Sequence, residues 1–253
     1  MATFLVPDGT YTANGVTVKE YDIVRHNPNG VNMPVKRSKP LKGVTIHNTG
    51  VIAVSGTTMA EQYTRATVNG NMNSVRVHYY VDHVEAWQNL SLDWQGWHAA
   101  DGSGDGNTAT IAIECIGSSA GAEDNAACLA AWLLKKYGLG VDALYTHTYW
   151  LNVRDGRGAG LSKDERCVLA HPYKVCPTYI IPHWAEFVAK VKGYMGTTAD
   201  ASGTSRMYRI YGQVGAYAVE ENYKAELEAA KKKYPSVMVS ITDGNGVKYK
   251  KVK

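Results

Sequence analysis

Short apolar strand patterns alternate with helical patterns over residues 1–194, and this alternation limits the possible folds of the chain more than any other feature. Val44–His47 predicts a buried strand that ends in a polar residue. Thr58 and Glu61 form a capping box, which predicts the start of a helix. Thr108–Ile116 predicts another strand, and a helix rich in Ala and Leu follows it. Strands that alternate with helices in this way predict an α/β domain.

The rest of the chain predicts further elements and a second domain. The other elements expected in the first domain are a strand at Val16–Val24, paired strands at Val75–Asp82 and Val84–Gln88, a helix from Asp124 or Asn125 to just before Gly138, a strand at Leu144–Thr148 and a helix from Pro182 to Tyr194. Residues 195–205 are small and polar, which predicts a linker. Residues 206–253 show a β-α-β-β pattern with a hairpin turn at Asp243–Gly246, which predicts a small α+β domain.

Positive charge is concentrated in this second domain. Residues 206–253 hold ten Lys and Arg residues and five acids, a balance of +5, so the rest of the +4 chain carries −1. A basic domain beside a near-neutral one favours a polyanionic partner, for which nucleic acid, anionic lipid and anionic wall polymers all qualify. About 48 residues is small for an independent fold, which favours a homo-oligomer formed through this domain.

The N-terminus and the cysteines indicate where the chain is made. The first residues lack a basic region followed by an apolar one, so no signal peptide is expected, and no apolar window is long enough for a membrane span. Synthesis in a bacterial cytoplasm is expected, with later release if the protein acts outside. For Cys115, Cys128, Cys167 and Cys176, free thiols or a metal ligand are expected, with disulfides as the alternative.

Two histidines and a cysteine are the candidates for chemistry. His47 lies at the end of an apolar strand pattern, His147 lies within another, and Cys176 precedes Pro177. Two imidazoles and a thiolate form a suitable donor set for Zn²⁺. Three protein ligands leave the fourth tetrahedral position for water, as in catalytic zinc sites, whereas structural sites are closed by a fourth protein ligand.

These segments have further motifs between them and resemble a known family as a series. The additional motifs are Val77–Asp82 (VHYYVD), Trp97–Ala99 (WHA) and Ile111–Glu114 (IAIE). Over roughly residues 40–190 the chain resembles the type-2 N-acetylmuramoyl-L-alanine amidases, which share their fold with peptidoglycan recognition proteins and with amidase endolysins of bacteriophages. The resemblance implies a mixed central sheet flanked by helices, and hydrolysis of the amide between the lactyl group of N-acetylmuramic acid and L-alanine.

The resemblance also implies roles for individual residues. His47, His147 and Cys176 would bind zinc. Glu114 would act as general base or acid, and Lys174 would stabilise the oxyanion of the tetrahedral intermediate. The residues expected to line the substrate groove are His78, Trp97 and His98, with Trp97 chosen because it adjoins His98 and because aromatic rings stack on sugars; core packing is its alternative.

One departure leaves the second ligand open. Family members usually place the second histidine and the cysteine fewer than ten residues apart, whereas His147 and Cys176 are 29 positions apart. The insert Asn152–Pro172 is rich in Gly, Arg and Asp, which predicts a long loop that covers the groove. His171 is therefore the rival ligand, and His147 is preferred because a strand fixes a ligand better than a loop does.

The leading hypothesis is a phage endolysin that cleaves peptidoglycan, with a host autolysin as its close variant. A non-catalytic binding module of the same fold is the second class, but such modules often lose the cysteine that is kept here as Cys176. A nucleic-acid-binding protein is disfavoured because the main domain is near neutral and has no such motif. Tyr208–Tyr217 faintly resembles the start of sporulation-related repeat domains, so a cell-wall-binding role is expected for residues 206–253.

Overall fold

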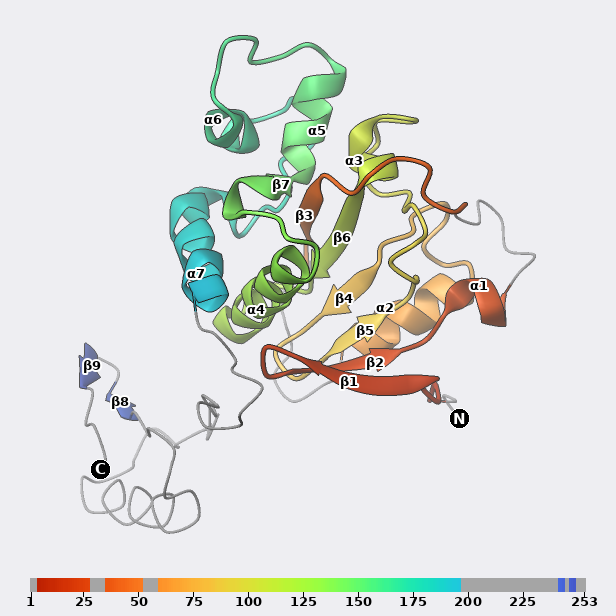
Figure 1. Cartoon of the computed structure of the whole chain (residues 1–253). Coiled ribbons are helices and arrows are strands. Elements are labelled where there is room, and N and C mark those ends of the chain that lie inside the picture. Colours follow the sequence, from red (N-terminus) through yellow and green to blue (C-terminus); the bar gives the residue numbers. More distant parts are fainter. Residues whose placement is uncertain (1–3, 28–34, 52–58, 197–240, 244–245, 249–253) are drawn as a thin grey trace. The chain divides into compact units, whose positions relative to one another are not determined.

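The structure of the protein is a computed structural model that describes residues 4–27, 35–51, 59–196, 241–243 and 246–248 (Figure 1). The chain divides into two compact units, Met1–Thr197 and Thr198–Lys253. Among the described residues, no helix has both the length and the apolar character needed to cross a membrane.

A mixed seven-stranded sheet forms the centre of the first unit. Its order is β1-β2-β5-β4-β6-β3-β7. The β1–β2 and β4–β5 pairs are antiparallel, and the other neighbours are parallel. The strands are β1 (Gly9–Ala13), β2 (Val16–Glu20), β3 (Gly43–Asn48), β4 (Tyr79–Val81), β5 (Ala86–Gln88), β6 (Thr110–Cys115) and β7 (Leu144–Thr146).

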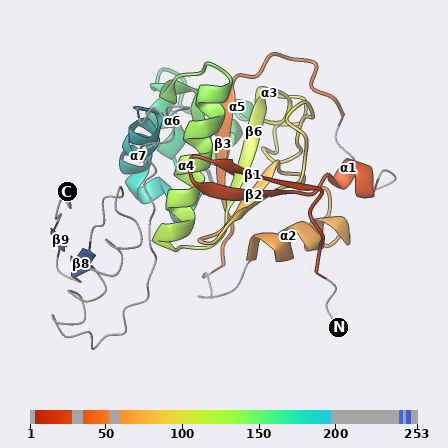
Figure 2. The same ribbon diagram turned by 60° about the horizontal axis from the view of Figure 1, so that its bottom comes forward.

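Helices cover both faces of this sheet. The α-helices are α1 (Ile23–His26), α2 (Met59–Val68), α3 (Asp105–Ala109), α4 (Ala120–Lys136), α5 (His147–Arg154), α6 (Lys163–Val168) and α7 (Trp184–Gly196), with 3-10 turns at Val141–Ala143 and Ile181–His183. Figure 2 shows α4 and α7 on one face and α2 on the other. The predicted α/β fold with a mixed sheet flanked by helices is confirmed.

Side chains that alternate along β3 and β6 point to opposite faces of the sheet. One face carries the main core, and the other carries the polar candidates for chemistry. Ile111 and Ile113 of β6 belong to the larger apolar cluster, which includes buried residues of α4 and α7. Ala112, between them, belongs to the smaller cluster on the α2 side. Because side chains alternate along a strand, Glu114 lies on the same face as Ala112. By the same rule, His47 of β3 lies on the face opposite Ile46, so both polar side chains project on the α2 side.

Several element boundaries differ from the sequence predictions. The strand predicted at Leu144–Thr148 ends at Thr146, whose side chain accepts a hydrogen bond from the Tyr149 amide and caps α5. His147 is therefore a helical residue and not a strand residue. Helix α4 begins at Ala120 behind the N-cap Ser119, several residues before the predicted caps Asp124 and Asn125.

The insert at 152–172 is not the predicted structureless loop. Helix α5 extends to Arg154, and α6 lies within the insert. Helix α6 begins with a capping box in which Ser162 and Glu165 satisfy each other's backbone amides. The Ser-x-x-Glu signature of this capping box is present in the sequence and would have predicted the start of α6.

The C-terminal unit is described only at its hairpin. Strands β8 (Ile241–Asp243) and β9 (Gly246–Lys248) pair antiparallel, on either side of the predicted turn. The predicted strand at Met207–Val214 and the helix at Glu220–Tyr234 lie outside the described residues. All four cysteines are free and buried, in agreement with the expectation of thiols.

Candidate metal centre

His47 projects from β3, which lies between β6 and the edge strand β7. Strand β3 is hydrogen-bonded on one side to β6 and on the other to β7, which holds its backbone at two edges. The register places His47 directly beside Glu114 of β6. The His47 side chain is buried, so the strand presents a fixed imidazole inside the protein.

His147 and Cys176 are brought together by one threonine. The Cys176 amide donates to Thr148 Oγ1 at 2.7 Å, and the Thr148 amide donates to the Cys176 carbonyl at 2.9 Å. Thr148 Oγ1 also donates to that carbonyl, at 3.0 Å. Thr148 lies one residue after His147 in the first turn of α5. These hydrogen bonds therefore hold Cys176 close to His147, although the two residues are 29 positions apart in the sequence.

The three predicted ligands converge on one point. Ligand atoms of His47, His147 and Cys176 all lie within 4.8 Å of one another, and all three side chains are buried. The two histidines face each other through their Nδ1 atoms, which are 3.2 Å apart. Two imidazoles and one thiol at this spacing fit a tetrahedral ion such as zinc with one position left for a further ligand.

Burial sets the protonation of these groups. Desolvation lowers the pKa of His47 well below its usual value and lowers that of His147 to about 3, so both rings are neutral and able to donate a lone pair. Desolvation also raises the pKa of the Cys176 thiol to about 12. A bound cation would favour the thiolate instead, because it supplies the positive charge that this buried group lacks. The residues therefore fit a metal ion.

Glu114 and Lys174 provide a carboxyl group and a positive charge near this cluster. Burial raises the pKa of Glu114 to about 7, although the positive charge of Lys174 opposes the shift. The side chain of Lys174 is exposed, and its charge also lowers the pKa of His47 and of His147. A carboxyl group with a near-neutral pKa can both accept and release a proton near pH 7.

The three residues expected to line the groove occupy different environments. Trp97 is 43% exposed, as a groove residue must be. His78 is fully buried; its Nδ1 accepts from the Ala112 amide at 3.0 Å, and its Nε2 lies 2.9 Å from the Trp94 carbonyl oxygen. This position makes His78 part of the interior and does not fit the groove prediction. His98 is also buried, and its Nδ1 lies 3.0 Å from His47 Nε2.

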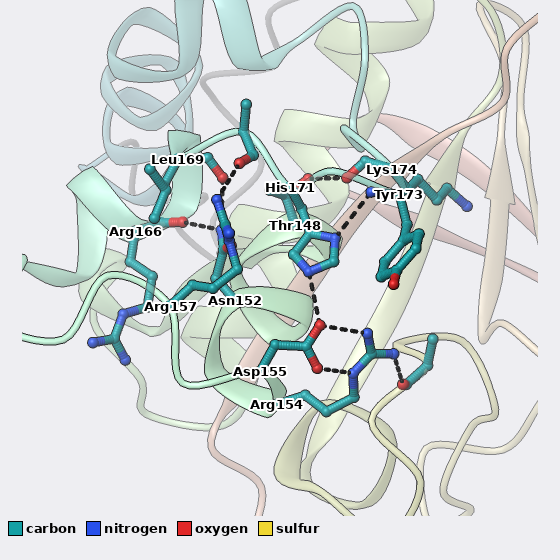
Figure 3. Close-up of polar contacts among 12 residues, drawn as sticks. Thr148, Asn152, Arg154, Asp155, Arg157, Arg166, Leu169, His171, Tyr173 and Lys174 are labelled. Carbon is teal, nitrogen blue, oxygen red and sulfur yellow. Dashed lines mark hydrogen bonds and ion pairs between the residues drawn. The ribbon is translucent and has the colours of Figure 1, made fainter.

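The structure places His171 away from the cluster. Its Nε2 is 3.0 Å from a carboxylate oxygen of Asp155, and its Nδ1 accepts from the Tyr173 amide at 3.3 Å. Figure 3 shows this pair, with Arg154 bound to the same Asp155 carboxylate. Of the two rival histidines, His147 is the one beside His47 and Cys176.

Sequence reasoning missed two residues that position the site. Thr148 is one, and Asn107, which is fully buried beside the Trp97–Ala99 motif, is the other. The Asn107 Oδ1 atom accepts from the amides of His98 and Ala99 at 2.7 and 2.8 Å. Local side-chain bonding by Thr and Asn is common, but their distant partners here give no signal in the sequence.

Comparison with known families gives a match that includes all residues of the candidate metal centre. A family model described as N-acetylmuramoyl-L-alanine amidase matches residues 37–178. The chain is 30% identical over 166 residues to N-acetylmuramoyl-L-alanine amidase XlyA of Bacillus subtilis (strain 168), which covers 64% of this chain and 48% of XlyA. It is 35% identical over 114 residues to XlyB of the same strain, which covers 42% of this chain and 34% of XlyB. The alignments thus span about half or less of these curated relatives.

Solved structures give the same fold. The catalytic domain of XlyA superposes with a TM-score of 0.54 at 27% identity, covering 70% of this chain and 99% of that domain. A mutant endolysin from Bacillus subtilis superposes with a TM-score of 0.54 at 28% identity, again over 70% of this chain and 99% of the other.

Proposed function

Since this chain belongs to the N-acetylmuramoyl-L-alanine amidase family, we propose that it hydrolyses the amide between the lactyl group of N-acetylmuramic acid and L-alanine in bacterial peptidoglycan. The observation that carries this proposal is the buried cluster of His47, His147 and Cys176, with Glu114 beside it in the register of the sheet. A non-catalytic binding module would not need this complete set of ligands and acid.

Zinc is the metal that we propose for the cluster. Imidazole and thiolate together favour zinc over magnesium or calcium, which prefer oxygen ligands. Zinc bound by His47, His147 and Cys176 would supply Lewis-acid activation of water and of the scissile carbonyl. Three protein ligands match the number found in catalytic zinc sites.

Two side chains of this chain would carry the remaining chemistry. Glu114 would take a proton from the attacking water and deliver it to the leaving amine of L-alanine, for which its pKa of about 7 is suitable. The ammonium group of Lys174 would stabilise the negative charge that develops on the carbonyl oxygen. Trp97, which is exposed, would stack on a sugar ring of the glycan.

We further propose that the chain acts as an endolysin, with its basic residues 206–253 holding the enzyme on anionic wall polymers. The net charge of +5 on that segment and the similarity to the Bacillus subtilis endolysin structure support this assignment. A host autolysin would use the same chemistry.

Mass spectrometry of digested cell walls tests the activity directly. The wild-type chain should release stem peptides with a free L-alanine amino group and leave N-acetylmuramic acid intact. Removing the metal with a chelator should stop the release, and adding zinc should restore it. Cys176→Ser and His47→Ala should each lose both bound zinc and activity, because each removes one of three ligands.

His26→Ala is the matched control, because His26 pairs with Asp8 outside the cluster, and this variant should keep its activity. Cleavage between sugars, or within the stem peptide, would contradict the proposed bond. Full activity of Cys176→Ser without metal would contradict the proposed metal centre.

A further inference from the structure

We infer that His98 is a positioning residue that fixes the orientation and the tautomer of His47 in the proposed metal centre. This inference rests on the proposed function, since it concerns how the chain holds a ligand for that metal. It replaces the groove-lining role expected for His98 from the sequence.

The first observation is that each ring nitrogen of His47 has a different neighbour. His47 Nδ1 faces His147 Nδ1 at 3.2 Å, on the side of the cluster. His47 Nε2 faces His98 Nδ1 at 3.0 Å, on the other side. The rings of His47 and His98 are perpendicular, with an interplanar angle of 89° and centroids 5.0 Å apart. This geometry suits a hydrogen bond along the edge of one ring.

The direction of that hydrogen bond follows from the chemistry of imidazole. A neutral imidazole carries one proton, so a ring that gives its Nδ1 lone pair to a metal keeps its proton on Nε2. His47 Nε2 would therefore donate, and His98 Nδ1 would accept. Histidine ligands of metals commonly donate their second N–H to such a partner, which fixes the ring and makes it a better ligand.

The second observation is that His98 is not accessible to a substrate. The residue is 6% exposed, and its Nε2 is buried without a hydrogen-bond partner among the described residues. A residue that reads a sugar or a peptide needs an exposed polar atom, and Trp97, its exposed neighbour, has the better position for that role.

The third observation is that the backbone around His98 is held from two other elements. The amides of His98 and Ala99 both donate to Asn107 Oδ1 of α3, at 2.7 and 2.8 Å. Arg154 at the end of α5 donates to the Ala100 carbonyl at 2.9 Å. An acceptor must stay fixed to orient its donor, and these three bonds anchor the backbone on both sides of the His98 side chain.

Three substitutions in the full chain separate a positioning role from mere packing. His98→Asn places an amide oxygen near the site of Nδ1 and can still accept the hydrogen bond. His98→Gln places its oxygen farther along the side chain, and His98→Ala removes the acceptor. Zinc affinity is measured by competition with a chromophoric chelator, and thermal unfolding of the metal-free protein reports whether each variant folds.

We expect His98→Ala and His98→Gln to bind zinc about 10–100-fold more weakly than the wild type. We expect His98→Asn to recover most of that affinity, and His83→Ala, a histidine outside the cluster, to bind like the wild type. If His98→Ala does not fold, the comparison of the Asn and Gln variants decides.

Equal zinc affinity of the Asn and Gln variants, whether both strong or both weak, would overturn the positioning role and leave the proposed metal centre in place. A wild-type chain that binds no zinc would overturn both proposals. The two failures are therefore distinguishable.

Discussion

The surroundings of Glu114 give its carboxyl group a pKa that suits proton transfer near neutral pH. It lies beside His47 in the sheet register, and burial raises its pKa to about 7 while the charge of Lys174 acts in the opposite direction. We predict that Glu114→Gln lowers the rate of amide hydrolysis by about 10²–10⁴-fold, the usual contribution of general acid–base catalysis. Gln has nearly the same shape but cannot take up a proton, so zinc binding and unfolding temperature should change little.

Turnover of muropeptides and bound zinc are measured on the same Glu114→Gln sample. Loss of zinc together with activity would mean that the carboxylate acts as a ligand and not as a base. Activity close to that of the wild type would remove Glu114 from the mechanism.

The elements of the site differ in how well their sequences predict them. Strand β3 was predicted because Val44, Thr45 and Ile46 are all β-branched, a residue type that favours strands, and its residues are buried between two neighbouring strands. His147 was assigned to a strand because the predicted strand Leu144–Thr148 contains Tyr145, Thr146 and Thr148, residue types that favour strands. The structure has a helix there because Thr146 caps its first turn and Thr148 binds the backbone of Cys176. Contacts with such a distant residue are not visible in the local pattern.

Another unpredicted element, α3, supports a motif that was recognised in the sequence. The segment Asp101–Asn107 is rich in Gly and Asp, a composition typical of loops, yet Asp101 accepts hydrogen bonds from the amides of Gly106 and Asn107, in the short helix that begins at Asp105. The side chain of Asn107 then holds the backbone of the His98 segment. The composition of this segment is that of a loop and does not reveal the fixed conformation that these hydrogen bonds impose.

We predict that Asn107→Ala lowers the free energy of unfolding by about 2–3 kcal/mol, because it leaves two buried amides, those of His98 and Ala99, without an acceptor. Urea unfolding of the metal-free chain measures this change. Asn125→Ala is the matched control: Asn125 is partly exposed and donates one hydrogen bond to the Asp82 carbonyl, so its loss should cost about 1 kcal/mol or less. Equal losses in the two variants would show that the Asn107 acceptor has no special role.

At the scale of the whole chain, chemistry and charge lie in different units. The residues of the candidate metal centre all belong to the unit Met1–Thr197, whereas the excess positive charge belongs to residues 206–253. A catalytic unit that is near neutral gains little from a polyanionic wall, because the attraction between them is weak. The basic segment is therefore the part of the sequence to which we assign the proposed retention on the wall.

We predict that a chain ending at Thr197 binds purified cell walls at least about tenfold more weakly than the full chain but hydrolyses soluble muropeptides within about twofold of its rate. Added salt should weaken wall binding of the full chain, since the Debye length falls from about 8 Å at 0.15 M to about 3 Å at 1 M. Replacing Lys231, Lys232 and Lys233 with Gln in the full chain should reproduce part of the loss. Co-sedimentation with walls at low and high salt measures all three effects. Wall binding that is unchanged by truncation would assign retention to the catalytic unit, and a loss that is insensitive to salt would point to recognition of glycan instead of charge.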